Sequence, residues 1–465
     1  MGELTSKDTA FGRKLLKDFM FADDYVNLNQ GSYGVIPRAV HETRLSYLAA
    51  LEARPDPFLR QTFPKLLRES RTALAELLRA PLDAVVLVPN ATTGVNTVLR
   101  SLRYAPGDVL VYFSCNYGAC QKTILYLEES TPVKGHRVEV RYPVGDDEIV
   151  RSFRDAVAAI RREGRRPVAA LFDVVVSMPG VRFPFEQMTQ VCREEGVLSV
   201  VDGAHGVGML DLDLGAALDP DFFVSNCHKW LFTPRGSCVM YASPRVHHLI
   251  RSTLPTSHGW QPLPNPNTNT NPNSNPTPEP ALYDATASFS APFELPGTTD
   301  PTPYLCVRAA LAYRSTTLPG ESAIHAHHVA FARAAGAALA QRLGTRVLSN
   351  AAHNASGLDT LGACAFSNVL LPLSSEKARE AGAKRLGRAV DAAAAGAGVL
   401  RWVSEEVLRV GGTFVAVVEY WGEWWVRLSG SVFLEVRDVV GVAGVLEDVC
   451  RRAEEGEWVE VLQEK

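Results

Sequence analysis

Stretches with helical periodicity alternate with short apolar runs rich in β-branched residues between about residues 40 and 250. The clearest of these segments are, in chain order, residues 63–79, 84–88, 152–164, 167–176, 197–202 and 222–226. The alternation is typical of βαβ units, in which helices cover both faces of a mainly parallel sheet. Because ligands on such sheets bind at the carboxyl ends of the strands, the residues after each apolar run are the first candidates for a functional site.

A different pattern begins after residue 260. Residues 261–280 are dominated by Pro, Asn and Thr, and because they have almost nothing apolar to bury they are predicted to form a flexible surface insertion. Two strand-like runs, GTFVAVVEYW and WWVRLSGSVF, follow helix-like segments at residues 304–315, 329–343 and 376–395. This order predicts a second, smaller α+β domain.

Composition and charge exclude several classes of function. The chain has 465 residues, of which 46% are hydrophobic and 21% are charged, as in soluble globular proteins of two or three domains. A net charge of −4 and the lack of a long basic run argue against binding to nucleic acid or to a membrane surface. With no secretory signal and no apolar run of membrane-spanning length, a cytoplasmic protein is expected, and Gly2 matches only the loose myristoylation pattern.

The eight cysteines are dispersed along the chain and are expected to be reduced. They form no CxxC pair, and the sequence contains no HExxH motif. Both patterns are common in zinc sites, so no metal site is predicted.

Polar residues follow the apolar run at residues 84–88, where the chain enters a helix-like stretch. Asn90, Ala91, Thr92 and Thr93 are therefore expected at a helix N-terminus, whose free N–H groups and dipole can hold an anion. The alternative is plain capping of the helix, which Asn90 or Thr92 could perform unaided. Taken alone, these residues fit capping better.

Ionisable residues stand at or near the ends of two later runs. Asp202 ends the run at residues 197–202, where a buried acid needs either a partner, such as the protonated ring nitrogen of a cofactor, or a helix to cap. His205 follows and could equally be a core histidine. Lys229 follows residues 222–226, and a desolvated lysine becomes a nucleophile toward aldehydes. An anion site, an acid and a lysine on one sheet together favour a cofactor site over an exposed lysine.

These residues and their surroundings resemble the fold-type I pyridoxal phosphate enzymes of the class V aminotransferase family, in the branch with cysteine desulfurases and isopenicillin N epimerase-like proteins. The similarity extends from YVNLNQGSYGVIP at residues 25–37 to VRLSGSVF at residues 426–433. It implies an α/β fold with a large cofactor domain at residues 36–319, whose mainly parallel sheet is flanked by helices. It also implies a smaller α+β domain at residues 320–465, and a segment at residues 1–35 that closes over the active site.

The resemblance implies a set of residues that bind pyridoxal 5'-phosphate. Lys229 matches the lysine that forms a Schiff base with the cofactor and later removes the Cα proton of the substrate. Asp202 matches the acid that pairs with the ring nitrogen, and His205 matches the residue that hydrogen-bonds the ring's 3-oxygen. Tyr117 lies where family members stack a ring over the cofactor face. The phosphate is expected to bind Ala91, Thr92, Asn226, His228 and Thr298.

The resemblance also implies an assembly and a substrate site. FELPGTT resembles a segment that reaches the phosphate from the neighbouring subunit, so Thr298 implies a homodimer with shared active sites. Arg427 resembles the arginine that grips the substrate α-carboxylate, and Asn29 to Ser32 look like the loop that closes over the substrate. Ser177 stands where many relatives carry an asparagine that helps to hold the carboxylate, so its part there is open.

The reaction class follows from a missing residue. No cysteine lies between Cys364 and Cys450, where a desulfurase would carry its nucleophile. NQGSYG, NATTGVNTVLRSL, NYGAC and NCHKWLFTPRGS resemble most the fungal branch that cleaves hercynylcysteine sulfoxide in ergothioneine biosynthesis. This implies a C–S lyase that releases ergothioneine, via a sulfenate, together with pyruvate and ammonia. An amino-acid epimerase, another cysteine-type lyase and, least favoured, a non-catalytic scaffold are the alternatives.

Three further features bear on that substrate. The aromatic run YWGEWW at residues 420–425 could face its trimethylammonium group, although a strand packed into the small-domain core is the better interpretation. His258 and Trp260 are weaker candidates for the same pocket. Cys120, near Tyr117, could protonate the leaving sulfur, and a buried inert thiol is the alternative.

Overall fold

The computed structural model describes residues 10–251, 254, 289–294 and 297–463. All structural statements concern these residues. The predicted insertion at residues 261–280, the candidate residues His258 and Trp260, and Gly2 lie outside them.

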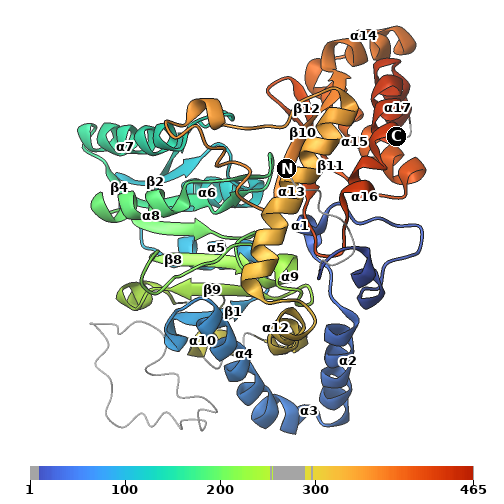
Figure 1. Cartoon of the computed structure of the whole chain (residues 1–465). Helices are drawn as coiled ribbons and strands as arrows, with labels where there is room; N and C mark the ends of the chain where they lie inside the picture. The colour runs from blue at the N-terminus through green and yellow to red at the C-terminus, as the bar shows by residue number, and fades with distance from the viewer. Residues whose placement is uncertain (1–9, 252–253, 255–288, 295–296, 464–465) are drawn as a thin grey trace, which may run out of the picture.

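The large domain is built on a seven-stranded sheet with helices on both faces (Figure 1). The strand order is β1-β9-β8-β7-β4-β2-β3, and β9 alone runs antiparallel to its neighbours. The strands are β1 (Val85–Val88), β2 (Asp108–Phe113), β3 (Lys134–Val138), β4 (Arg166–Asp173), β7 (Leu198–Asp202), β8 (Phe222–Asn226) and β9 (Cys238–Ala242). The predicted mainly parallel sheet is therefore confirmed, and its apolar strands are buried on both faces.

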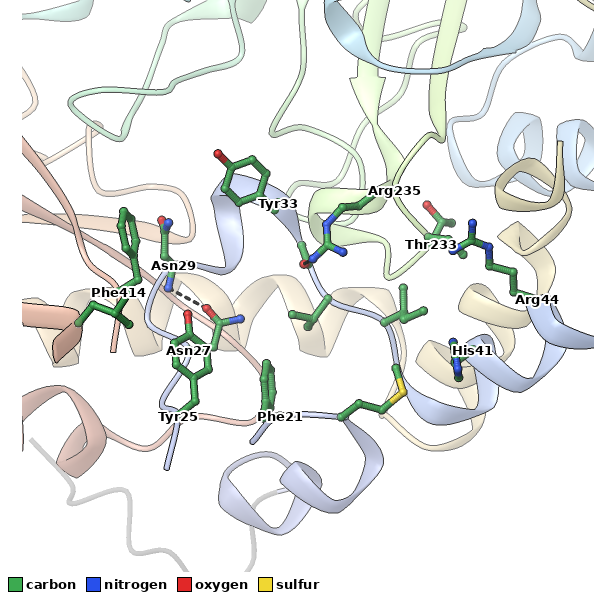
Figure 2. Close-up of a pocket in the computed structure, with 16 residues that line it drawn as sticks. Phe21, Tyr25, Asn27, Asn29, Tyr33, His41, Arg44, Thr233, Arg235 and Phe414 are labelled. Atoms are coloured by element: carbon green, nitrogen blue, oxygen red, sulfur yellow. Dashed lines mark hydrogen bonds between the residues drawn. The ribbon is translucent and has the colours of Figure 1, made fainter. Parts of the chain in front are cut away.

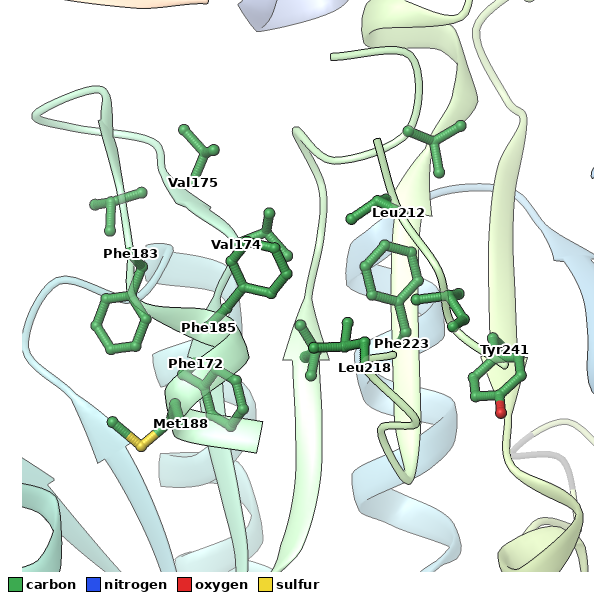
Figure 3. Packing of buried hydrophobic residues seen from close by; sticks show 14 of the residues in the cluster. Phe172, Val174, Val175, Phe183, Phe185, Met188, Leu212, Leu218, Phe223 and Tyr241 are labelled. Atoms are coloured by element: carbon green, nitrogen blue, oxygen red, sulfur yellow. The ribbon is translucent and has the colours of Figure 1, made fainter. Parts of the chain in front are cut away.

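Alternate residues of the strands face two separate helical layers. Val85 and Leu87 belong to the core shared with α4, α7 and α8, whereas Val86 and Val88 belong to the core shared with α5 and α6. The helices are α4 (Phe63–Leu77), α5 (Ala91–Ser101), α6 (Gly118–Ser130), α7 (Asp146–Arg162) and α8 (Phe185–Glu194). Figure 3 shows part of the first core, where the ring of Phe183 lies 6.1 Å from that of Phe172.

The small domain contains a three-stranded antiparallel sheet in the order β10-β12-β11. Its elements are α13 (Glu321–Leu343), β10 (Phe366–Ser374), α14 (Ser375–Leu386), α15 (Ala392–Gly411), β11 (Ala416–Tyr420), β12 (Glu423–Ser429), α16 (Val436–Val440) and α17 (Ala443–Glu454). The predicted α+β character is confirmed. The helix-like run 376–395, however, is two helices, because Gly387 ends α14 with φ +65° and Asp391 accepts a hydrogen bond from the Ala394 N–H at the start of α15.

A long helix connects the two domains. The long helix α13 leaves the large domain and packs against β10 of the small one (Figure 1). It follows α11 (Thr302–Leu305) and α12 (Val307–Thr316), which divide the predicted helix at residues 304–315. Within the described residues, no helix combines the length and the apolar character that a membrane span requires.

The N-terminal segment lies between the two domains. Phe19 packs against Phe433 of the small domain with ring centroids 4.8 Å apart. Further along, α1 (Gln30–Tyr33) contacts the turn that carries Lys229, and the Gln30 side chain donates to the Lys229 carbonyl at 2.8 Å. The segment therefore contacts both the small domain and the turn that carries Lys229.

Candidate active site

Lys229 lies on a one-turn helix, α9 (Cys227–Trp230), directly after the buried strand β8. Its Nζ is 3.2 Å from His205 Nε2. Burial, followed by the charge of Arg427, lowers the pKa of the Lys229 amine to about 8. The unprotonated amine, the form that a nucleophile or a base requires, is therefore a minor fraction near neutral pH and the major form above pH 8.

The backbone of the N-terminal segment lies very close to the turn that carries Lys229. A Cβ at Gly34, which has φ +65°, would lie 1.7 Å from the His228 carbonyl oxygen. Only glycine allows this approach.

Two buried carboxylates lie side by side at the ends of adjacent strands. Asp202 of β7 is in register with Asp173 of β4, and burial raises the pKa of each. Asp202 accepts hydrogen bonds from the Cys120 thiol at 3.2 Å and from the Ala204 N–H at 3.0 Å. Asp173 accepts one from Asn116 Nδ2 at 2.6 Å. Asp173 is absent from the residues predicted from sequence, because the apolar run at residues 167–176 continues past it and hides the end of the strand.

Cys120 and Tyr117 occupy different surroundings although they are three residues apart. The Cys120 side chain is buried beneath Asp202, and burial raises the pKa of its thiol well above the ordinary value. This agrees with the inert-thiol alternative. Tyr117 is 51% exposed at the start of α6, with no tertiary side-chain hydrogen bond among the described residues. Its ring is free to lie against a bound ligand.

The N-terminus of α5 meets the end of β8. The Asn226 side-chain oxygen accepts from the Ala91 N–H at 2.9 Å, and Asn90 caps the helix by accepting from the Thr93 N–H at 2.8 Å. The capping interpretation of Asn90 is therefore correct. Thr92 lies between these two bonds, and its hydroxyl has no partner among the described residues. This leaves the Thr92 side chain and the helix dipole available for an anion.

His228 lies beside this helix terminus. Its Nδ1 is 3.0 Å from the Ser237 carbonyl oxygen, which can only accept, so Nδ1 carries the proton. Burial lowers the pKa of His228 to about 4. The other edge of the ring is the one that remains for a ligand.

Arg427 of β12 is a buried cation held by neutral groups. Its Nη1 donates to the Ser177 carbonyl at 2.7 Å, and its Nη2 donates to Asn29 Oδ1 at 2.8 Å and to Ser32 Oγ at 2.9 Å. Within the described chain no carboxylate pairs with it, and its Nε has no partner. Burial lowers the pKa of Arg427 to about 10. A buried guanidinium with no acid beside it is a site for an external carboxylate. Ser177 contributes its main-chain oxygen to this arrangement.

A cavity of about 790 Å³ adjoins this cluster through Asn29 (Figure 2). Aromatic rings from the N-terminal segment and the small domain line it, namely Phe21, Tyr25, Tyr33 and Phe414. Arg44 and Arg235 line its far side, and Arg44 is paired with Asp300 at 2.9 Å. Asn29 lines both the cavity and the Arg427 cluster, whereas Lys229, Asp202 and Arg427 do not line the cavity.

Two predicted regions remain, Thr298 and the aromatic run at residues 420–425. Thr298 is exposed. In the aromatic run, Trp424 and Trp425 are buried in the cores, whereas Trp421 is 57% exposed over Arg141. The run is thus packed mainly as a structural strand, the favoured alternative, and the rings near Asn29 come from other parts of the chain.

Residues 34–361, more than half of the chain, match the family described as Aminotransferase class-V. The chain belongs to the class V aminotransferase family. The L-cysteine desulfhydrase-like protein lolT1 of Epichloe uncinata is 36% identical, covering 96% of this chain and 97% of its own length. The hercynylcysteine sulfoxide lyase of Schizosaccharomyces pombe is 25% identical, covering 96% and 99%. The resemblance seen in the sequence is confirmed.

A solved structure shares the fold. A mutant of C-DES, with glycine covalently linked to its PLP cofactor, superimposes with a TM-score of 0.69 at 16% identity. The match covers 93% of this chain and 99% of that chain. The predicted fold-type I architecture is thereby confirmed.

Pyridoxal phosphate is the cofactor of the class V aminotransferase family, and the residues present fit it. Lys229 offers a buried amine whose hydrogen-bond partner is a neutral histidine, and Asp202 offers a buried carboxylate with no cation in contact among the described residues. Thr92 and the α5 terminus offer an anion site beside them. The amine, the carboxylate and the anion site therefore match the aldehyde, the ring nitrogen and the phosphate of the cofactor, in that order.

Proposed function

We propose that the protein is a pyridoxal phosphate-dependent lyase that cleaves the Cβ–S bond of a cysteine-type amino acid. The observation that carries this proposal is the pairing of a buried, partly unprotonated Lys229 with a buried Arg427 that has no acidic partner in the described chain. An amino acid brings the carboxylate that Arg427 lacks and the Cα proton that Lys229 can remove.

Each residue has a role in this proposal. The cofactor, when bound, supplies an electron-withdrawing ring that makes the Cα proton acidic. Arg427 binds and orients the α-carboxylate, and Asn29 and Ser32 hold the guanidinium in place. Lys229 takes the Cα proton on its Nζ. Asp202, buried and hydrogen-bonded to Cys120, holds a proton at the ring nitrogen.

The thiols of the chain favour release of the sulfur over its transfer to the protein. All eight cysteines are free, seven are buried, and Cys115 is half-buried. Burial raises the pKa of every one of these thiols. A desulfurase needs an accessible thiolate to receive the sulfur, and the described chain presents none. The sulfur group therefore leaves as a product, with pyruvate and ammonia from the rest of the substrate.

The finer proposal is that the substrate is hercynylcysteine sulfoxide. It is supported by the lyase relative in Schizosaccharomyces pombe, which matches along nearly its whole length. The aromatic rings of Phe21, Tyr25, Tyr33 and Phe414 offer faces to a trimethylammonium group. The competing substrate is cysteine itself, supported by the more similar desulfhydrase-like relative.

The test is to incubate the holoenzyme with hercynylcysteine sulfoxide and, separately, with cysteine, and to follow pyruvate and the sulfur product. Pyruvate from the sulfoxide at a much higher kcat/KM supports the finer proposal, and sulfide from cysteine alone overturns it while leaving the lyase in place. Inversion at Cα without pyruvate would overturn the lyase and favour an epimerase. Lys229→Ala is the inactive control.

A further inference from the structure

Trp230, the residue after the lysine, contacts the histidine that faces the lysine. Its Nε1 donates to His205 Nδ1 at 3.3 Å, while His205 Nε2 lies 3.2 Å from Lys229 Nζ. The His205 ring thus lies between the side chains of Lys229 and Trp230, which are adjacent in sequence. Both rings are buried, with Trp230 1% and His205 2% exposed.

The chemistry of the indole decides which nitrogen of His205 carries the proton. An indole N–H can only donate, so Nδ1 of His205 must present its lone pair. Burial, together with the charges of Lys229 and Arg427, lowers the pKa of His205 well below its ordinary value, so the ring is neutral. A neutral ring with a bare Nδ1 has its single proton on Nε2.

We propose that Trp230 is a positioning residue that holds His205 in the Nε2–H tautomer, directing its only proton toward the Lys229 amine. When Lys229 is unprotonated, the Nε2–H donates to the lone pair of its Nζ. The hydrogen bond favours the neutral amine, which is the form that reacts. The same edge would be able to donate to the 3-oxygen of the cofactor, whereas the other tautomer would present a lone pair there.

The surrounding packing keeps the two rings in this orientation. Phe366 lies edge-on to both, with centroids 5.1 Å from His205 and 5.5 Å from Trp230. His328 also contacts Trp230, with ring centroids 5.4 Å apart. Rotation of either ring would require movement of these neighbours, so packing keeps Nδ1 of His205 facing the indole N–H, and that hydrogen bond sets the tautomer. The proposal rests on the family's cofactor and is independent of the sulfur-containing substrate.

The direct test is the position of the proton in the wild-type holoenzyme. Selective ¹⁵N labelling of histidine with long-range ¹H–¹⁵N correlation separates a protonated from an unprotonated ring nitrogen, and a His205→Gln variant assigns the signals. The expected result is a protonated Nε2 and a bare Nδ1. A proton on Nδ1 would overturn the proposal without any variant of Trp230.

The second test is Trp230→Phe, which keeps a buried ring but removes the N–H. We expect both tautomers of His205, a shifted pH midpoint of the visible band of the bound cofactor, and a fall in kcat/KM of about tenfold, the effect of one hydrogen bond. The matched control is Trp424→Phe, which also loses a buried indole N–H bond, to Ser375 Oγ at 2.8 Å in the small domain. Trp424→Phe should keep the wild-type tautomer of His205 and the wild-type pH midpoint of the visible band. A folded Trp230→Phe enzyme with both unchanged would refute the role of Trp230.

Discussion

At the scale of single residues, the site is governed by ionisable groups that burial holds away from their ordinary protonation. Burial lowers the pKa of Lys229, and Asp173 and Asp202 lie buried beside each other on adjacent strands. Arg427 is a buried cation that no carboxylate of the described chain pairs with. Each of these states costs folding free energy, because a charge in the interior is poorly solvated. The costs can be measured in the apoprotein, where no ligand offsets them.

Lys229→Met should stabilise the apoprotein at pH 7. The pKa of Lys229 is lowered from 10.5 to about 8, so below pH 8 the folded state holds a poorly solvated ammonium, at a cost of about 3 kcal/mol. Between pH 8 and 10.5 the unfolded state binds the additional proton, so wild-type stability rises and the advantage of the variant disappears. Urea unfolding across this pH range checks the prediction. Lys122→Met, at an exposed position, should follow the wild-type curve.

Asp173→Asn should also stabilise the apoprotein, by about 1 kcal/mol or more at pH 8. Burial, followed by the charge of Asp202, raises the pKa of Asp173, so its contribution to stability is complete below its unfolded pKa and is lost as pH rises. The asparagine can still accept from Asn116. The advantage should therefore shrink as pH falls toward 4, and bound cofactor should keep its visible band.

Asp202→Asn is the matched comparison, because it removes the neighbouring carboxylate instead. It should displace the visible band of the cofactor and reduce activity strongly, since the ring nitrogen loses its acid. An Asp173→Asn enzyme that lost the band to the same extent would show that the two acids have exchanged roles.

At the scale of elements, the turn that carries Lys229 is hydrogen-bonded to α12, the helix that precedes the interdomain helix α13. Arg314 of α12 is fully buried and donates to the Trp230 carbonyl at 2.8 Å and to the Gly208 carbonyl at 3.0 Å. It also makes a bidentate pair with Glu321, the first residue of α13, at 2.5 and 2.6 Å. The start of the interdomain helix and the turn of Lys229 are therefore joined through one guanidinium.

Arg314→Met should lower the free energy of unfolding by about 3 kcal/mol, because it removes the donor to two carbonyl oxygens and leaves Glu321 with only His325, at 3.3 Å. Glu321 retains 28% exposure, which places the cost at the lower end for a broken buried pair. Adding Glu321→Gln should recover part of the loss, and urea unfolding of the four proteins gives the coupling energy. Additive losses would mean that the pair is not coupled.

At the scale of the whole molecule, the single chain leaves Thr298 exposed and Tyr117 half exposed. We propose that the chain forms the homodimer that the family resemblance implies, which would cover these residues and bring Thr298 to the phosphate site of the partner. In sedimentation, the protein should have twice the mass of one chain.

A mixture of Lys229→Ala and Thr298→Glu chains tests the shared site. Each variant alone should be inactive, the second because its carboxylate repels the cofactor phosphate. When the two are refolded together, half of the dimers are mixed and each has one intact site, so about a quarter of the wild-type activity should return. No recovery, with mixed dimers present, would place Thr298 in the site of its own chain.

The fold and the ends of its strands could be predicted because both depend on local patterns. Asp202, Asn226 and Lys229 are visible as polar residues directly after apolar runs, and the structure brings them to one edge of the sheet. Asp173 was missed because apolar residues continue beyond it. The break at Gly387 was missed because an Ala-rich run resembles one helix.

The sequence by itself determined the α/β architecture, the family and the order of the residues with reactive side chains. Only the tertiary structure decided which buried groups face one another: Asp173 beside Asp202, Trp230 on His205, and Arg427 with no acid within reach in the described chain. Hydrophobic periodicity is a property of neighbouring residues and survives in the sequence. The partner of a buried polar atom depends on which distant strands become adjacent, and this sets its protonation and hence its chemistry.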